Sequence, residues 1–312
     1  MFDLLLYINW NVNPDAFSVG SFSIRWYGIL FSCAFIASYY AYKELLKFDR
    51  DIPEDFAERS LTYMVLGTII GARIGDCFFY NHEYYLQNPL EIFYVWRGGL
   101  SSHGGALGIL TALFILARTS KKPYIWVLDR VVIVIGVAGF FIRTGNLMNS
   151  EIYGHATSVP WGFIFEKRGE TQAMHPTQIY EALYYALTYM VLRYIYRKND
   201  NRPKPYLIFG LFLIIVFGFR FCIEFIKNLH DSELEDKIFS TIGLNMGQIL
   251  SAPFIILGAI MLIVSKKQTQ PKPATVTTNK PENIIHPKQT HKKDKHSHTN
   301  QRNKKSFNKK VK

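Results

Sequence analysis

The sequence places seven ionisable side chains inside or at the edges of long apolar stretches, where a charge is costly. They are Arg73, Asp76, His103, Arg143, Glu181, Arg220 and Glu224. An ionisable group at such a depth usually faces a polar cavity that has a function. We therefore take these seven residues as the starting set for a functional site.

The densest polar string is RTGNLMNSEIYG, residues 143–154, which leaves one of the apolar stretches. A loop that only connects two apolar stretches would be polar, but it would not need an arginine that still lies within the apolar stretch. The planar fork of Arg143, together with the amide of Asn146, suits a phosphodiester group. Glu151 is placed to steer a cation or to relay a proton. The string predicts the centre of a phosphate-binding site.

Arg220 and Glu224 lie four residues apart, so they share one face of a helix and can form an ion pair. Two interpretations fit this spacing. The pair could only neutralise charge and fix packing. Alternatively, Glu224 orients the guanidinium while Arg220 keeps donors free for a phosphate.

His103 is followed by two glycines at the expected start of a helix. Glycines there permit close backbone approach to an anion, and a histidine can accept a proton near neutral pH. The same residues also fit an interfacial histidine followed by small residues for helix packing.

The string HPTQIYE, residues 175–181, begins another apolar stretch. Pro176 suits a helix start, and Glu181 lies four residues after Thr177. A capping role and a catalytic role are both open for this string.

The three cysteines, Cys33, Cys77 and Cys222, each lie within an apolar stretch and form no CxxC spacing. We expect small buried side chains there, without a disulfide framework or a metal site.

The elements that position these residues follow from hydropathy. A bilayer core about 30 Å thick needs about 20 mostly apolar residues per helix. Seven stretches qualify: 22–46, 60–80, 101–118, 124–145, 176–196, 206–226 and 247–265. We predict an all-α integral membrane protein with seven transmembrane helices. Asp3 and the lack of preceding basic residues argue against a cleaved signal peptide.

Orientation follows from the basic residues of the loops. With the N-terminus outside, the inner loops hold 11 Lys and Arg residues and the outer segments hold five. This bias predicts an N-out, C-in topology, with segments 81–100, 146–175 and 227–246 outside.

The net charge of +12 comes entirely from the C-terminal end. Residues 266–312, called the tail below, hold 14 Lys and Arg against two acidic residues. We predict a membrane domain over 1–265 and a disordered, Lys-rich cytoplasmic tail that attracts anionic headgroups. The neutral body has no surplus charge for nucleic acid, which we exclude as a partner.

The chain resembles the bacterial prolipoprotein diacylglyceryl transferases. The motifs that carry the resemblance run in order along residues 1–265: SIRWYG (23–28), GARIGDCFFYN (71–81), WRGGLSSHGGALG (96–108), RTGNLMNSEIYG (143–154), HPTQIYE (175–181), GFRFCIEF (218–225) and MGQILSAP (246–253). The string R-x-G-N-x-x-N-x-E-x-x-G is highly specific. The tail lies outside the resemblance.

The resemblance implies a seven-span enzyme of the bacterial inner membrane. Such an enzyme moves the diacylglyceryl group of phosphatidylglycerol to the thiol of a lipobox cysteine in the signal peptide of a preprolipoprotein. The products are a thioether-linked precursor and glycerol 1-phosphate, and no cofactor or metal is required. Phosphatidylglycerol, the preprolipoprotein and membrane lipids would be its partners.

The resemblance also assigns residues. The expected catalytic residues are His103, Arg143, Glu151 and Arg220. The expected substrate-binding residues are Tyr27, Arg73, Gly104, Arg143, Asn146, Gly154, Tyr180 and Glu224. One departure is Val216, which stands where some members of the family carry a tyrosine, so a phenol role at that position is in doubt.

The chemistry needs a thiolate and a neutralised leaving phosphate. Arg143 and Arg220, aided by Asn146, are the candidates for the phosphate. His103 is the candidate general base; alternatively, it only orients the headgroup and the thiol loses its proton elsewhere.

Two other classes of protein remain open. A transporter also uses intramembrane ion pairs and glycine-broken helices, but seven spans without a repeat fit it poorly. A lipid-binding protein without transferase activity would keep the arginines and tolerate the loss of His103. Covalent transfer of lipid to a cysteine separates the enzyme from both.

Overall fold

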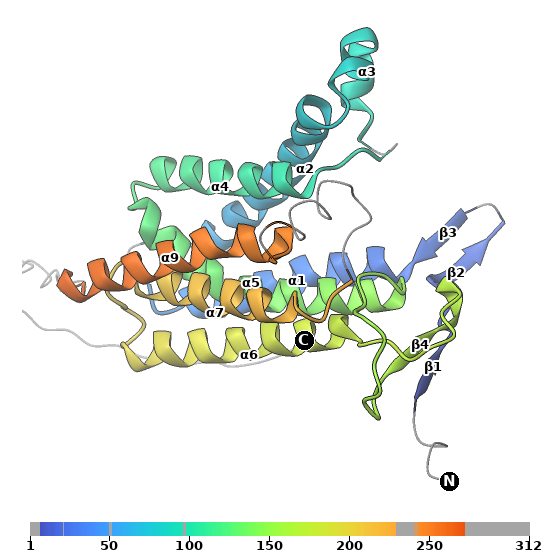
Figure 1. Ribbon diagram of the computed structural model, residues 1–312. Helices are drawn as coiled ribbons and strands as arrows, with labels where there is room; N and C mark the ends of the chain where they lie inside the picture. The colour runs from blue at the N-terminus through green and yellow to red at the C-terminus, as the bar shows by residue number, and fades with distance from the viewer. Residues whose placement is uncertain are drawn as a thin grey trace, which may run out of the picture. The chain divides into compact units, whose positions relative to one another are not determined.

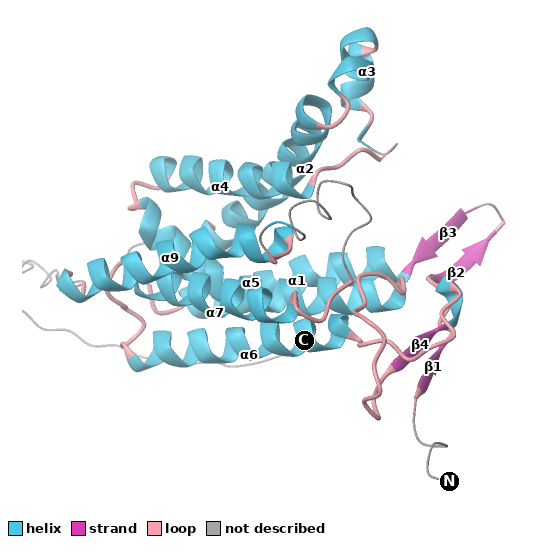
Figure 2. Ribbon diagram, viewed as in Figure 1, coloured by secondary structure: helices cyan, strands magenta, loops and turns pink. Residues whose placement is uncertain are grey.

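The computed structural model describes residues 7–20, 22–49, 52–95, 98–228, 241 and 243–271. Helices dominate this part of the chain (Figure 1, Figure 2). The long helices are α1 (Trp26–Leu46), α2 (Phe56–Phe79), α4 (Ser102–Thr119), α5 (Tyr124–Met148), α6 (Thr177–Lys198), α7 (Leu207–Ile223) and α9 (Met246–Lys267). The short elements are α3 (His82–Gln87), η1 (Pro89–Phe93), η3 (Glu166–Arg168), β1 (Ile8–Trp10), β2 (Asp15–Val19), β3 (Phe22–Arg25) and β4 (Phe163–Phe165).

A long helix lies on each of the seven predicted apolar stretches, with some shifted boundaries. The predicted start of the first stretch at 22 is wrong, because Phe22–Arg25 forms strand β3 and the helix begins at Trp26. Helix α5 continues to Met148, beyond the predicted end at 145. The arginine of the RTGN string therefore lies inside a helix.

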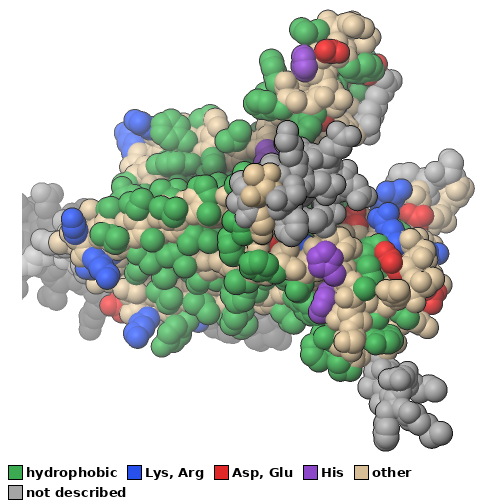
Figure 3. Space-filling model, in the orientation of Figure 1, with side chains coloured by type: hydrophobic (Ala, Val, Ile, Leu, Met, Phe, Trp, Pro, Cys, Tyr) green, Lys and Arg blue, Asp and Glu red, His purple; other side chains and the backbone are tan. Residues whose placement is uncertain are grey.

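Three helical stretches of the described chain are long and apolar enough to cross a bilayer: Phe56–Tyr80, Tyr124–Met148 and Met246–Lys267. Helix α7 is apolar but only 17 residues long. The face drawn in Figure 3 is largely apolar along the helices, with Lys and Arg gathered towards their ends. This distribution is typical of a membrane protein.

Helix α5 is the central element of the core. It packs against α1, α6 and α7, and its segment from Val127 to Val134 is buried throughout. Asp129, in that segment, accepts hydrogen bonds from the backbone N–H groups of Tyr206 and Phe209 at 3.0 and 2.8 Å. This carboxylate thereby satisfies N–H groups at the start of α7 that have no partner within the helix.

Helices α2 and α4 cross at glycines. A Cβ atom on Gly71 would lie 2.4 Å from the carbonyl oxygen of Gly104, and one on Gly108 would lie 2.0 Å from that of Gly67. Only glycine permits backbones to approach so closely, as at membrane-helix interfaces with small residues. The glycines of the HGGALG string are thus used for packing.

The four strands lie together at one end of the helices (Figure 1). Strand β1 pairs in parallel with β4, and β2 pairs antiparallel with β3. The indole of Trp10, in β1, donates to the carbonyl of Leu147 at 3.0 Å. This hydrogen bond fixes the N-terminal segment to the end of α5, where the polar string begins.

Helix α9 ends at Lys267 and thus includes the first two residues of the predicted tail. Residues 272–312, which make up most of the predicted disordered tail, lie outside the described residues.

Candidate functional site

A cavity of about 740 Å³ lies where several helix ends meet, and we call it the reaction cavity. The start of α4, the end of α5, the end of α7 and the start of α9 contribute to its wall. It is lined by His103, Arg143, Ser150, Glu151, Ile152, Tyr153, Arg168, Arg220, Glu224, Lys227, Asn228, Met246, Gly247 and Leu250. All four predicted catalytic residues therefore line one cavity, although they come from three separate segments of the chain.

Arg143 points from the last turns of α5 into this cavity with only 13% of its side chain exposed. Its Nε lies 3.1 Å from Oε2 of Glu181. One terminal nitrogen donates to Oδ1 of Asn146 at 3.2 Å. The guanidinium is thus held along one edge by a carboxylate, as a preorganised anion-binding group requires.

Glu181 is completely buried at the start of α6 and lies between two cations. Besides Arg143, it contacts Nζ of Lys227 at 2.7 Å. Glu181 is one of the intramembrane charges predicted from the sequence, whereas Lys227 is not among them. The only signal for Lys227 was its position one helical turn after Glu224, at the end of an apolar stretch.

The ion pairs continue from Lys227 to the end of α7. Lys227 lies 3.6 Å from Glu224, and Glu224 lies 3.6 Å from Arg220. A Cβ atom on Gly247 would meet the Glu224 carboxyl carbon at 2.4 Å, so this glycine makes room for the carboxylate. Cations and carboxylates alternate from Arg143 to Arg220, which lets three cations share the cavity region without excess repulsion.

The amides of the RTGN string hold Glu151. Asn146 and Asn149 both donate to its Oε1, at 2.8 and 3.2 Å. Asn146 thereby connects Arg143 to Glu151. Both carboxamide ends of Asn146 are occupied, so its main action on a ligand is through the two charged side chains that it orients.

The loop after α5 is held in an unusual conformation by the HPTQ string. Ile152 has φ +62°, a left-handed conformation that is unfavourable for a β-branched residue. Thr177 donates to the carbonyl of Ile152 at 2.7 Å, and Gln178 donates to that of Glu151 at 2.7 Å. Thr177 and Gln178 are fully buried. For the HPTQ string, these contacts favour a positioning role over direct contact with a ligand.

Gly154 joins the same loop to the segment after α7. Its position pairs with Lys227 in a short antiparallel bridge, and His155 N–H donates to the carbonyl of Ile226 at 2.9 Å. A Cβ atom on Gly154 would lie 2.1 Å from that carbonyl oxygen. Gly154 therefore brings Lys227 close to Arg143 and does not line the cavity itself.

His103 is exposed to the cavity at the start of α4. Ser101 caps this helix and accepts from the N–H of Gly104 at 3.2 Å. The Nδ1 of His103 lies 3.2 Å from the hydroxyl of Tyr80. If Nδ1 donates to Tyr80, Nε2 is left as a proton acceptor.

Besides Gly154, five predicted substrate-binding residues do not line the reaction cavity: Tyr27, Arg73, Gly104, Asn146 and Tyr180. Arg73 donates to the backbone carbonyls of Glu91, Ile92, Gly98 and Gly99, which occupies its guanidinium. Tyr27 packs on α5, where a Cβ atom on Gly145 would lie 2.9 Å from its ring. The Tyr180 hydroxyl accepts from the indole of Trp161 at 2.7 Å.

Val216 is buried in the main hydrophobic core, where it offers no polar group. The reaction cavity does contain a phenol, that of Tyr153, whose hydroxyl donates to Glu170 at 2.6 Å. Burial and this hydrogen bond raise the pKa of Tyr153 to about 12. The hydroxyl hydrogen of Tyr153 is thus directed at Glu170.

Within the described residues, no group of three His, Cys, Asp or Glu side chains is placed to hold a metal ion. The cavity instead gathers three arginines and one lysine around a space large enough for a polar headgroup. Such a set binds and stabilises oxyanions, phosphates above all.

Comparison with known proteins gives a consistent result. A sequence model of the family described as prolipoprotein diacylglyceryl transferase matches residues 14–264. A phosphatidylglycerol--prolipoprotein diacylglyceryl transferase from Chloroherpeton thalassium is 41% identical, covering 86% of this chain and 98% of that protein. A protein with the same name from Porphyromonas gingivalis is 39% identical, covering 84% of this chain and 95% of that protein. The chain belongs to the prolipoprotein diacylglyceryl transferase family.

Proposed function

We propose that this protein transfers the diacylglyceryl group of phosphatidylglycerol to the cysteine thiol of a preprolipoprotein lipobox. The names of its relatives specify the same lipid and the same class of acceptor. The observation that carries the proposal is that His103, Arg143 and Arg220 line one cavity. This set combines a potential base with two phosphate-binding forks.

The proposed reaction is a nucleophilic displacement at carbon. The thiolate sulfur attacks C3 of the glyceryl group, a C–S bond forms, and the bond from C3 to the phosphate oxygen breaks. The bonding electrons leave with that oxygen, so the phosphodiester becomes glycerol 1-phosphate. Arg143 and Arg220 stabilise the charge that develops on the leaving phosphate.

His103 takes the thiol proton in this proposal and then passes it to water or to the released phosphate. The 3.2 Å contact of Nδ1 with the Tyr80 hydroxyl supports this role, because an Nδ1–H that donates to Tyr80 leaves Nε2 as the acceptor. Glu151 and Glu224 orient the cations around the phosphate. In this scheme, Tyr27, Arg73, Gly104, Gly154 and Tyr180 act by holding the helices and loops that carry the site.

We further propose that all seven long helices cross the inner membrane, with the N-terminus outside and the C-terminus inside. Supporting this, the cavity wall draws on the starts of α4 and α9 and on the ends of α5 and α7. Helices of alternating direction would present these ends on the same side. The bias of basic residues puts that side outside, where a lipobox cysteine would be accessible.

The test is transfer of labelled diacylglyceryl from phosphatidylglycerol to a lipobox peptide by the purified protein. We expect a thioether product with the Cys peptide and none with a Cys→Ala peptide. A folded protein that binds phosphatidylglycerol but forms no product would instead support a lipid-binding or transport function.

A further inference from the structure

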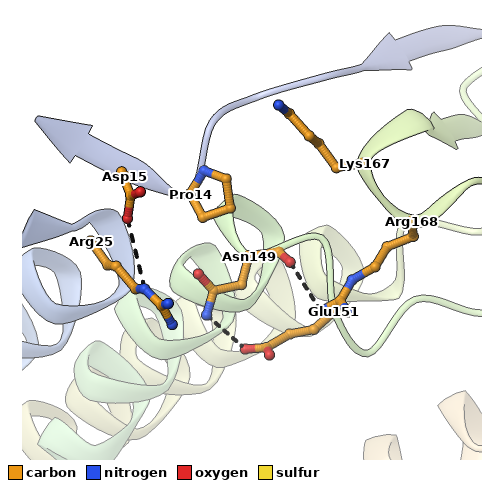
Figure 4. A pocket seen from close by; sticks show the side chains of 7 residues that line it. All are labelled: Pro14, Asp15, Arg25, Asn149, Glu151, Lys167 and Arg168. Carbon is orange, nitrogen blue, oxygen red and sulfur yellow. Dashed lines mark hydrogen bonds and ion pairs between the residues drawn. The ribbon is translucent and has the colours of Figure 1, made fainter. Parts of the chain in front are cut away.

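A second cavity, of about 370 Å³, adjoins the reaction cavity, and we call it the outer cavity. Glu151 and Arg168 line both cavities. Its other walls come from the start of β2, the end of β3, the end of α5 and η3 (Figure 4). The remaining lining residues are Pro14, Asp15, Arg25, Asn149 and Lys167. The proposed reaction gives this cavity no role.

Three cations from two elements, β3 and η3, surround the outer cavity: Arg25, Lys167 and Arg168 (Figure 4). Arg25 is only loosely paired, at 3.7 Å from Asp15, and 71% of its side chain is exposed. Arg168 donates to backbone carbonyls, those of Ser150 and Asn149, at 2.9 and 3.3 Å. Within the described part of the chain, neither Arg168 nor Lys167 lies in an ion pair. The outer cavity therefore has positive charge free for an anion.

The reaction cavity differs in this respect. There, Arg143, Lys227 and Arg220 alternate with Glu181 and Glu224. Each of these three cations lies in an ion pair, whereas Lys167 and Arg168 lie in none among the described residues. A phosphate monoester carries close to two negative charges at neutral pH, because its second pKa lies near 6. The proposed reaction thus creates a leaving group that is attracted to the unpaired cations of the outer cavity.

Glu151 lies at the junction and limits how tightly an anion binds in the outer cavity. Asn146 and Asn149 hold its carboxylate in place. A site through which a product leaves must bind that product strongly enough for it to enter and weakly enough for it to dissociate. Three cations with two carboxylates meet this condition better than a tight, fully basic pocket.

We propose that the outer cavity is a binding site for the phosphate monoester product on its way out. This inference rests on the proposed function, because that reaction supplies the monoester. The ligand class is a small, water-soluble phosphate monoester, with glycerol 1-phosphate as the member produced. The acyl chains play no part in its recognition.

Equilibrium dialysis of radiolabelled glycerol 1-phosphate tests the site, using the full chain in detergent micelles that contain phosphatidylglycerol and no peptide. The test variant is Lys167→Glu, because Lys167 is exposed and lines only the outer cavity. The matched control is Lys198→Glu, an exposed lysine in the last turn of α6 that lines neither cavity.

We expect saturable, salt-sensitive binding that Lys167→Glu weakens about tenfold, the low end of the range for electrostatic focusing in a charged cleft. Lys198→Glu should leave the binding unchanged. Unlabelled inorganic phosphate should compete, whereas glycerol should not. Binding that is absent, equal in Lys167→Glu, or displaced by increasing phosphatidylglycerol would overturn the inference; the last result would indicate a lipid-headgroup site.

The transfer assay with the same preparations separates this inference from the proposed function. Thioether formation together with Lys167-independent binding would leave the function standing and remove the exit site. Lys167-dependent binding by a protein that forms no thioether would remove the proposed function and the exit role together, leaving only an anion site.

Discussion

Replacing Glu181 with glutamine should destabilise the protein strongly, because one buried carboxylate serves two cations. Glu181 has no exposed surface and lies 3.1 Å from Arg143 and 2.7 Å from Lys227. Glutamine keeps the shape and removes the charge. Leaving buried charge without its partner typically costs about 3–5 kcal/mol. We expect a loss of about this size in the free energy of unfolding, with loss of transfer activity as Arg143 reorients.

A double-mutant cycle isolates the charge effect. Lys227→Met alone leaves Glu181 paired with Arg143, so we expect a smaller cost. Adding Lys227→Met to Glu181→Gln removes a buried cation that keeps only its 3.6 Å contact with Glu224, and the combined loss should fall short of the sum by about 1–3 kcal/mol. Reversible unfolding in mixed micelles of increasing SDS content measures all three variants.

The matched control is Glu44→Gln. Glu44 is 44% exposed and pairs with Arg193 and Arg197 near the surface, so its loss should cost no more than about 1 kcal/mol. A Glu181→Gln protein as stable as this control would refute the reasoning, as would strict additivity in the cycle.

Three further predictions concern the parts that hold the site. Tyr80→Phe should lower the transfer rate about threefold to tenfold, because the ring of His103 loses its hydrogen-bond partner. This loss is smaller than the roughly hundredfold loss expected when a general base is removed. An unchanged rate would show that the contact does not orient the ring. Gly154→Ala should cost about 1–3 kcal/mol, because its Cβ atom would overlap the Ile226 carbonyl; thermal unfolding with wild-type stability would contradict the close approach. Burial and neighbouring His155 lower the pKa of His175 below its usual 6.5, so the unfolded state binds this proton more readily and stability should fall as pH drops below 6.5. Between pH 7.5 and 5, the melting temperature of His175→Gln should fall less than that of the wild type. Equal falls in the two proteins would argue that His175 does not cause the pH dependence.

The sequence predicted the helices well, because each needs a long apolar stretch, which is a local signal. It also singled out His103, Arg143, Glu151 and Arg220, which line one cavity, since charges and glycines in apolar surroundings are conspicuous. Lys227 escaped notice because it follows an apolar stretch and resembles an ordinary interfacial lysine. Its partner, Glu181, lies 46 residues away, and only tertiary packing joins the two.

The roles of the supporting residues were also not readable from the sequence. Arg73 has the residue type of a phosphate ligand, yet backbone carbonyls occupy its guanidinium. For the string that contains Thr177 and Gln178, the sequence favoured neither a capping role nor a catalytic role. Only the folded chain shows that the two side chains donate hydrogen bonds to the loop carbonyls of Ile152 and Glu151. The four strands were missed because segments of three to five residues produce no clear alternation.

We propose that the cations around the reaction cavity drive displacement of a phosphate from a lipid. Mass spectrometry of a lipobox peptide, incubated with the protein and phosphatidylglycerol vesicles, tests it most directly when wild type and Arg143→Ala are compared. We predict a diacylglyceryl mass increase on the cysteine with the wild type. Folded Arg143→Ala should produce none, and Arg143→Lys should also be poor because a point charge lacks the bidentate fork. Equal modification by Arg143→Ala, or no modification by folded wild-type protein, would contradict the account.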